Sequence, residues 1–355
     1  MSVYKITEEK LSRLGEHIFI RSGLSKEDAK ISAAVLTTND IRGVHSHGST
    51  MYCGYSRMLR SGGANPKAEL ISTGFGSIRI CDGQRGLGVL SAYKAMQAAN
   101  EAARETGVGI ASVHGSTHAA ALGYYAMMAA EQGFFGIAMS NGDPVMSIPG
   151  TKGRVMGNNP FAYAAPMGNG RFVLFDIAMS VIAGGKVKNF EIDKKLLPEG
   201  WLIDTEGNPT RDPAVFRKGG TLLPFAMHKG YGFAVMVEAL SGVLSGAGIV
   251  RDNVDWAANP SAPNDIGHFL FALDIEKFMT LDQFYLRMQK MRNDIKSAPR
   301  VGQSEVMLPG EMEFSAALKQ RNNGIEISEA VYSNIRLAAE ETGLMDDFNT
   351  AFEPV

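Results

Sequence analysis

Residues 83–91 read "GQRGLGVLS", and this glycine-rich stretch decides which fold class the sequence predicts. It follows a segment with strand-like alternation (68–83) and precedes an alanine-rich amphipathic pattern (88–107) that predicts a helix. A Rossmann dinucleotide turn would need a third glycine where Ser91 stands, and an acidic residue about 20 residues on at the end of a second strand. Neither is present, so we interpret the stretch as a glycine-rich helix entry and expect a different α/β fold.

Strand and helix patterns alternate outward from this stretch. Strands are expected at 108–113, 134–141, 171–180 and 267–275, and helices at 118–133 and 229–246, the last of which we expect to be buried. Helical patterns dominate both chain ends: two helices are expected within residues 1–42, the first ended by Gly23 and the second at 24–41, and others at 51–66, 281–296 and 328–343. The sequence therefore predicts an α/β (α+β) protein. Its α/β domain spans residues 71–280, and a helical domain is formed by residues 1–70 plus 281–355.

Composition narrows the class of protein. The 355 residues include 45% hydrophobic and 20% charged residues, and 35 Lys+Arg against 37 Asp+Glu give a formal charge of −2. No basic block stands out, which argues against nucleic acid as the main partner. Cys53 and Cys81 are the only cysteines, which indicates neither a disulfide framework nor a thiolate metal site. Without an apolar run of about 20 residues or an apolar signal core, we expect a soluble cytoplasmic protein and no membrane partner.

Two histidine pairs are the first candidates for chemistry. "GVHSHGST" (43–50) places His45 and His47 one residue apart, and "VHGSTH" (113–118) places His114 and His118 four apart. Either pair could bind one metal ion, although a catalytic site would also need a carboxylate. The local sequence offers none, so Asp176 would have to come from elsewhere in the fold. A metal-dependent hydrolase, an acid/base site and histidines that only cap turns all remain open at this point.

Several segments, in order over about residues 5–325, resemble the malate/L-lactate dehydrogenase-like oxidoreductase family. This family also holds ureidoglycolate, sulfolactate, diketogulonate and piperideine-2-carboxylate reductases or dehydrogenases. The matching segments are "DIRGVHSHGST" (40–50), "VHGSTHAAALGYYAMMAAEQGFFGIAMSN" (113–141), "GNNPFAYAAP" (157–166), "LFDIAMSVIAGGKV" (174–187), "GWLIDTEGNPT" (200–210), "LLPFAMHKGYGFAVMVEALSGVLSGAG" (222–248) and "LPGEMEF" (308–314).

The resemblance implies a fold and an activity. The fold would be a non-Rossmann α/β domain with a mixed sheet that binds NAD or NADP, flanked by helices from both chain ends, in a homodimer. The activity would be hydride transfer between the nicotinamide and a small 2-hydroxy or 2-keto acid, or a cyclic imine. The alternatives are a metal-dependent hydrolase that uses the histidine pairs, and a non-catalytic homologue that binds a nucleotide or a small acid.

The family pattern also implies site residues. His118, which we expect at the mouth of a helix, matches the acid/base histidine, and His47 with Ser46 matches the substrate pocket, as does Asn141. Histidine suits proton transfer because its reference pKa of about 6.5 allows both protonation states near neutrality. The family often has arginine where Met51 stands, and a thioether cannot clamp a carboxylate as a guanidinium does. Arg57 and Arg60 could substitute for it.

The cofactor contacts implied by the resemblance come from four segments, and no metal ligands are assigned. They are Ser140, the run Asp176, Ile177, Ala178 and Ser180, the basic Lys229, and the late loop Leu308, Pro309, Gly310 and Glu311. Met179 replaces a hydroxyl residue that the family usually has in the second of these segments. Glu238 is expected to be a buried structural acid.

Overall fold

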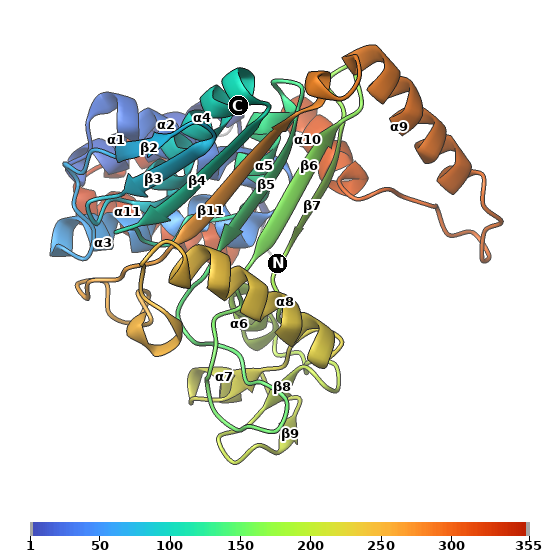
Figure 1. The fold of residues 1–355 in the computed structure, drawn as a ribbon. Coiled ribbons are helices and arrows are strands. Elements are labelled where there is room, and N and C mark those ends of the chain that lie inside the picture. Colours follow the sequence, from blue (N-terminus) through green and yellow to red (C-terminus); the bar gives the residue numbers. More distant parts are fainter. Residues whose placement is uncertain (1–2, 353–355) are drawn as a thin grey trace.

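The computed structural model describes residues 3–352, and its centre is a mixed β-sheet (Figure 1). Within these residues the sheet has seven strands in the order β2-β3-β4-β11-β5-β6-β7, and β3–β4 is its one parallel pair. The strands are β2 (Ile71–Phe75), β3 (Ile78–Asp82), β4 (Val108–His114), β5 (Phe134–Ser140), β6 (Phe161–Pro166), β7 (Phe172–Ile177) and β11 (His268–Asp274). This largely antiparallel order differs from the parallel Rossmann sheet, as the sequence predicted.

Strand β11 occupies the middle of the sheet although it comes late in the chain. It pairs antiparallel with β4 and β5, which places His268 opposite both Val113 and Ser140. His268 of β11 therefore lies beside the end of β4 on one side and beside the end of β5 on the other.

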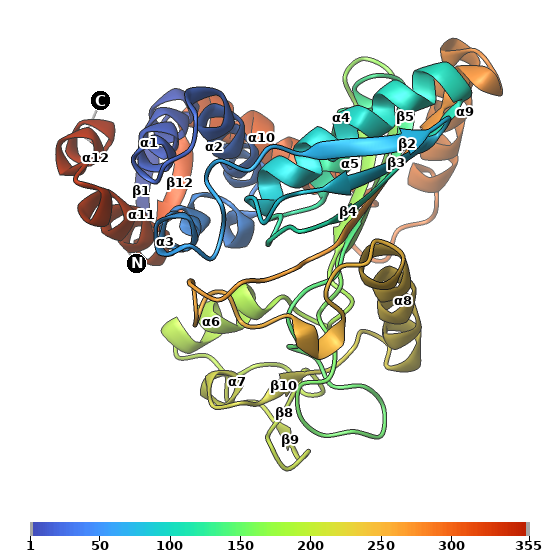
Figure 2. The same cartoon turned by 60° about the vertical axis from the view of Figure 1, so that its left-hand side comes forward.

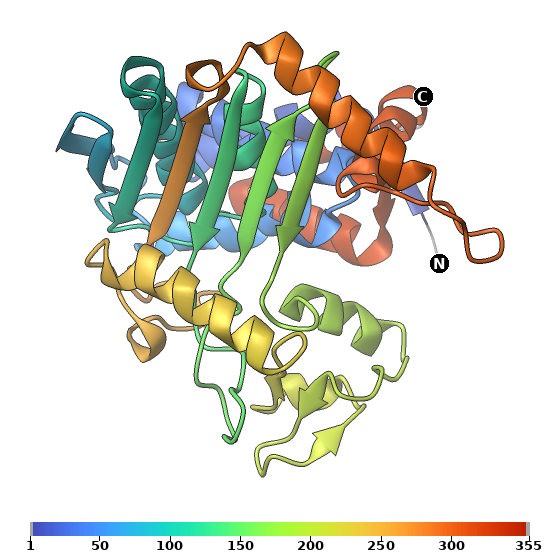
Figure 3. The same ribbon diagram turned by 45° about the vertical axis from the view of Figure 1, so that its right-hand side comes forward.

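Two helices cover one face of the sheet, α4 (Gly88–Thr106) and α5 (Gly123–Ala130). Both helices approach the strands closely because small residues line the contact between each helix and the sheet. A Cβ at Gly109 would lie 1.7 Å from the carbonyl oxygen of Ala99, and one at Gly136 would lie 2.4 Å from that of Ala126. Figure 3 shows the opposite face of the strands without a helix laid across its middle, with α8 (His228–Glu238) along one end and α9 (Leu281–Lys296) at the other.

Segments from the two chain ends pack beside the sheet (Figure 2). Strand β1 (Val3–Ile6) pairs antiparallel with β12 (Ile325–Ser328), so that Val3 lies opposite Ser328. The helices of this region are α1 (Glu8–Arg21), α2 (Lys26–Ile41), α3 (Tyr52–Ser61), α10 (Glu311–Asn323), α11 (Glu329–Thr342) and α12 (Met345–Ala351). The domain boundaries near residues 70 and 280 remain a prediction.

A smaller unit lies below the sheet in Figure 1. It contains α6 (Gly184–Ile192), α7 (Ala214–Arg217) and a small sheet in the order β10-β8-β9, with strands β8 (Leu202–Ile203), β9 (Pro209–Thr210) and β10 (Thr221–Leu222). Its apolar cluster includes Ile182, Val187, Leu197, Leu202 and Leu222. Sequence patterns did not predict this unit, because its strands are too short to show alternation.

Most predicted elements are confirmed, and two need correction. The helix expected at 118–133 begins only at Gly123, because the chain at Ala120 adopts a positive φ of 58° that a helix cannot contain. The helix expected to be buried at 229–246 is buried along one face only: Ala234 and Val237 are buried, whereas Phe233 is 50% exposed. None of the helices among residues 3–352 is long and apolar enough to cross a membrane.

Candidate active site

The loop that carries His118 packs against the glycine-rich stretch 83–91. The backbone N–H of Gly88, the first residue of α4, donates to Oγ1 of Thr117 at 2.9 Å. A Cβ at Gly88 would stand 2.0 Å from the carbonyl oxygen of Thr117, so only glycine permits this approach. The glycines therefore serve packing between the helix entry and the His118 loop.

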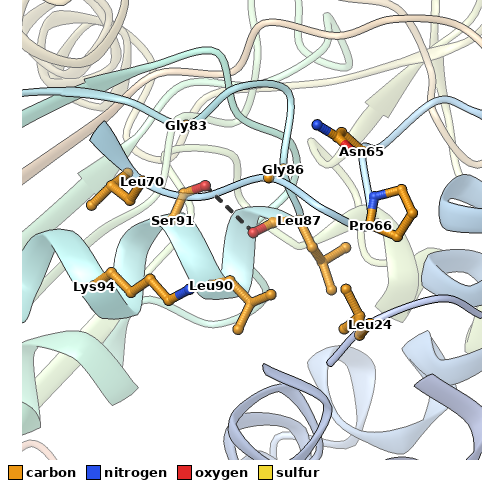
Figure 4. A pocket seen from close by; sticks show the side chains of 11 residues that line it. Leu24, Asn65, Pro66, Leu70, Gly83, Gly86, Leu87, Leu90, Ser91 and Lys94 are labelled. Carbon is orange, nitrogen blue, oxygen red and sulfur yellow. Dashed lines mark hydrogen bonds between the residues drawn. The ribbon is translucent and has the colours of Figure 1, made fainter. Parts of the chain in front are cut away.

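Figure 4 shows a small cavity that is lined in part by residues of the stretch 83–91. Gly83, Gly86, Leu87 and Ser91 surround a cavity of about 10 Å³ together with residues near Pro66. Such a volume holds one water molecule at most. A dinucleotide has no room there, which agrees with the expectation that this is not a Rossmann turn.

The structure brings His47 and His118 together. Their rings stack with centroids 5.6 Å apart and an angle of 30° between planes. Ser46 Oγ lies 2.9 Å from Nδ1 of His47, which fixes that ring. His45 faces away, because its Nδ1 lies 2.9 Å from the buried carboxylate of Asp40. A Cβ at Gly48 would lie 2.3 Å from the same carboxylate, so Gly48 permits this turn.

Two further aromatic residues hold the ring of His118, and the sequence patterns singled out neither. The hydroxyl of Tyr55, on α3, lies 2.6 Å from Nδ1 of His118. The indole of Trp256 stacks on the same imidazole, with centroids 5.1 Å apart and 26° between planes. No local period pointed to Tyr55, because His47 lies in a separate short turn before α3 begins at Tyr52.

The hydrogen bonds at Nδ1 decide the tautomer of His118. The backbone N–H of Ala120, which can only donate, points at Nδ1 from 3.4 Å. Nδ1 is therefore an acceptor, the Tyr55 hydroxyl donates to it, and the neutral ring carries its proton on Nε2. Burial is the main cause that lowers the pKa of His118 to about 3 and that of His47 to about 4, so both are neutral at pH 7. Both side chains are partly accessible to solvent, and water offsets part of this effect.

The predicted cofactor residues gather at the ends of β5 and β7. Asp176 is exposed in this chain and accepts a hydrogen bond from the N–H of Gly123 at 2.7 Å; the groups packed around its carboxylate favour a raised pKa, and contact with water limits that rise. Ile177 ends β7, and Ala178 follows it, partly exposed. Ser180 Oγ donates to the carbonyl of Ile182, and Ser140 Oγ to that of Asn141.

The start of α8 approaches this segment closely. Phe225 N–H donates to the carbonyl of Met179 at 2.9 Å, and a Cβ at Gly230 would also lie 2.9 Å from that oxygen. Lys229, in the first turn of α8, is exposed and makes no ion pair within the described residues. The segment 176–180 and the Lys229 turn thus form one surface.

The late loop 308–311 lies against the edge strand β7. The carbonyl of Pro309 accepts from the N–H of Leu174 at 3.1 Å, and Gly310 has a φ of +95°. The loop is closed by Glu311, which accepts from the N–H of Leu308 and pairs with Arg292 and Lys296 of α9. Leu308 is buried.

The side-chain amide of Asn141 is hydrogen-bonded to three other parts of the chain. Its amide nitrogen donates to Glu238 at 3.1 Å and to the carbonyl of Gly248 at 2.7 Å, while its oxygen accepts from the N–H of Gly267 at 2.9 Å. Glu238 is 5% exposed and also accepts from Asn159 and from the backbone of Val250. The predicted substrate contact by Asn141 stays a prediction, since the amide is bonded to protein here.

Comparison with known proteins decides the family. The family model described as malate/L-lactate dehydrogenase matches residues 6–336. The chain belongs to the malate/L-lactate dehydrogenase family. It is 36% identical over 354 residues to a malate dehydrogenase of Pyrococcus abyssi, covering 96% of this chain and 95% of that protein. It is 31% identical to the NAD(+) ureidoglycolate dehydrogenase of Escherichia coli, covering 92% and 94%.

The fold is shared with solved members of this family. The sulfolactate dehydrogenase of Methanocaldococcus jannaschii superposes with a TM-score of 0.89 at 32% identity, covering 98% of this chain and all of the other. As a member of a dehydrogenase family, the chain is an oxidoreductase. The metal-dependent hydrolase receives no support: among residues 3–352 no group of three or more His, Cys, Asp or Glu is placed to hold a metal ion.

The structure also shows whether Arg57 or Arg60 could replace the arginine that the family often has at position 51. Arg57 and Arg60 both pair with Glu341 of α11, on the side of α3 that meets the chain end. They are therefore engaged away from His118, and we reject them as substitutes for the guanidinium that the family often has at position 51. Lys186, on α6, is the cation whose charge acts on His47.

Proposed function

We propose that this family member is an NAD(P)-dependent oxidoreductase that transfers hydride between a nicotinamide and a small 2-hydroxy or 2-keto acid or a related compound. The observation that carries the proposal is the neutral His118, whose Nδ1 is bonded to Tyr55 and whose Nε2 therefore holds the proton. When bound, the nicotinamide supplies or accepts the hydride.

The side chains supply the proton. In the direction of reduction, the anionic substrate favours uptake of a second proton by His118, and the resulting imidazolium gives its Nε2 proton to the substrate oxygen as that oxygen gains negative charge, which returns the ring to its neutral form. His47, oriented by Ser46, lies beside it and can donate a hydrogen bond to the same oxygen or to the carboxylate. In the direction of oxidation, Nε2 must be bare, so the Tyr55 hydroxyl has to accept from Nδ1 instead of donating.

The residues predicted to contact the cofactor fit a dinucleotide. Lys229 and the positive end of the α8 dipole favour an anion such as a phosphate. Asp176 offers an accepting oxygen beside the His118 loop, and loop 308–311 flanks β7. Ser140 and Ser180, which are bonded to carbonyl groups, shape the backbone at this surface.

We also propose a homodimer in the cytoplasm. An apolar row crosses three strands on the uncovered sheet face, where Phe135, Tyr163 and Phe175 contact one another at centroid distances of 5.7–5.8 Å and remain partly exposed. Together with exposed apolar residues of α8, this row is the kind of surface that a second subunit covers. Cys53 and Cys81 are free and buried, which suits a reducing compartment.

The variant His118→Ala tests the acid/base assignment. General acid/base catalysis contributes about 10²- to 10⁴-fold, so turnover should fall by that factor. The Kd of NADH or NADPH, followed by cofactor fluorescence, should stay within a few-fold of the parent value, because His118 lies outside the proposed cofactor segments. Near-normal turnover in this variant would remove His118 from the mechanism.

Turnover by the unmodified protein tests the substrate class and separates this function from cofactor binding alone. The unmodified protein should oxidise reduced cofactor at 340 nm with at least one 2-keto acid or cyclic imine. Cofactor binding without turnover of any such compound, tested with both NADH and NADPH, would favour the binding role.

A further inference from the structure

The side chains around His118 carry little positive charge for a site that takes small acids. Met51, at the N-terminal boundary of α3, precedes Tyr55 by about one helical turn and packs, half-buried, against the apolar cluster that contains Tyr55. Arg57 and Arg60 are bound to Glu341. The site therefore has a thioether where a second anion of the substrate would need a partner.

One cation is placed to meet a single carboxylate. Lys186 follows Gly185, where a Cβ would stand 3.5 Å from Cβ of Ser46, so the first turn of α6 packs on the residue that holds His47. Its side chain is exposed, and its charge helps to lower the pKa of His47. Lys186 can thus approach an anion bound at the histidine pair.

Trp256 supplies an apolar wall at the same site. Its ring lies 5.1 Å from that of His118 and 5.5 Å from that of Tyr55. Gly54 leaves room for the indole, because a Cβ there would lie 2.8 Å from Cζ3 of Trp256. The indole is therefore packed against α3 and next to the ring that exchanges the proton.

The segment that carries Trp256 is fixed at both sides. The N–H of Val254 donates to Asn264 at 2.8 Å, and Ser61, at the end of α3, donates to the carbonyl of Pro260 at 2.9 Å. Gly63 also approaches that carbonyl so closely that a Cβ would stand 2.0 Å from its oxygen. Trp256 is therefore a preformed part of the pocket.

Building on the proposed function, we propose that Trp256 and Met51 receive the substituent of a 2-keto monocarboxylate, an apolar or flat group, while Lys186 pairs with its one carboxylate. A second carboxylate in this place would lose its hydration against an indole and a thioether without gaining a partner. An apolar group is favoured there, because each methylene in a hydrophobic pocket changes kcat/KM by about 10- to 200-fold.

Steady-state kinetics with four keto acids test the proposal. The parent enzyme should prefer phenylpyruvate and 4-methyl-2-oxopentanoate over oxaloacetate by at least about 10-fold in kcat/KM. Trp256→Ala should lower the phenylpyruvate to pyruvate ratio of kcat/KM by about 10-fold or more, and Trp256→Phe should lower it less. Met51→Arg should raise kcat/KM for oxaloacetate relative to pyruvate, because a guanidinium clamps the second carboxylate.

Tryptophan fluorescence gives a readout that does not need turnover. The chain has two tryptophans, and Trp201 contacts Phe190 in the small lower unit. Phenylpyruvate should quench the emission of Trp201→Phe, which keeps Trp256, and should leave that of Trp256→Phe unchanged apart from the inner-filter effect measured with free tryptophan.

The outcomes separate the two proposals. Absence of turnover in the parent with every keto acid and cyclic imine, with cofactor still bound, contradicts the proposed function, and the quenching experiment then still decides whether Trp256 meets the ligand. Turnover with a preference for oxaloacetate, or an unchanged phenylpyruvate to pyruvate ratio in Trp256→Ala, overturns the inference and leaves the proposed function intact.

Discussion

The ring of His118 contacts the rings of His47, Tyr55 and Trp256, and these contacts define its chemistry at the scale of single residues. Tyr55 sets which nitrogen holds the proton, and the stacked rings keep water from much of the imidazole. A histidine held in this orientation can exchange a proton with the substrate at Nε2 without first rotating.

Tyr55→Phe should therefore slow the reaction while sparing binding. Without the hydroxyl, Nδ1 of His118 loses its partner at 2.6 Å, and the ring is no longer held in one orientation. We expect kcat to fall by about 10- to 100-fold with little change in KM or in cofactor Kd. Tyr124→Phe, whose ring contacts Tyr93 and Tyr125, is the matched control. Equal effects of the two variants on kcat would refute a positioning role for Tyr55.

At the scale of elements, the entry of α4 and the His118 loop form one packed unit. Gly88→Ala would bring a methyl group to 2.0 Å from the Thr117 carbonyl, so the loop must shift. We expect a stability loss of about 1–3 kcal/mol in urea unfolding, as for overpacked interiors, and a turnover loss larger than the change in cofactor Kd. Gly142→Ala, where the Cβ meets open space, should change neither stability nor turnover appreciably. Full turnover in Gly88→Ala would show that the close packing of Gly88 on Thr117 does not position His118.

His268 links β11 to the loops at both its sides. Its Nε2 lies 2.9 Å from Ser116 Oγ and its Nδ1 2.9 Å from Ser140 Oγ, and burial lowers its pKa to about 4. A lowered folded-state pKa means that the unfolded chain binds the proton more readily. The stability that His268 contributes is thus complete above pH 6.5 and is lost as the pH falls toward 4.

Urea unfolding at pH 7.5 and pH 5 measures this contribution. From its lowered pKa, protonation of His268 in the unfolded chain should reduce the free energy of unfolding by about 2 kcal/mol at pH 5. His268→Gln removes this dependence but keeps every other titrating group, so the difference between the two proteins isolates it. Parallel pH profiles for parent and variant would show that His268 titrates normally.

At the scale of the whole molecule, the uncovered sheet face is the largest unexplained feature. We expect the protein to sediment as a dimer at micromolar concentration. Phe233→Asp combined with Leu244→Asp should weaken association by at least about 100-fold, because charges would replace exposed apolar side chains of the α8 region. Leu196→Asp, also at an exposed apolar residue but in the small lower unit, is the control. A monomeric parent, or a dimeric double variant, would contradict the proposed interface.

The sequence alone determined most elements, the non-Rossmann character, the family and the two candidate residues His47 and His118. These rest on local patterns: helix and strand periods, the missing third glycine at Ser91, and the spacing of short motifs around His47 and His118. Such patterns reflect which side chains are buried and which backbone groups are hydrogen-bonded within a few residues. The regular repeats of the helix and the strand determine both.

Only the tertiary structure decided how distant residues meet. It placed β11 between β4 and β5, stacked Trp256 on His118 from 138 positions along the chain, and bound Arg57 and Arg60 to Glu341. It also showed that "GQRGLGVLS" seats the His118 loop through Gly88. The physical reason is that these contacts depend on the packing of whole elements, whose partners no local period specifies.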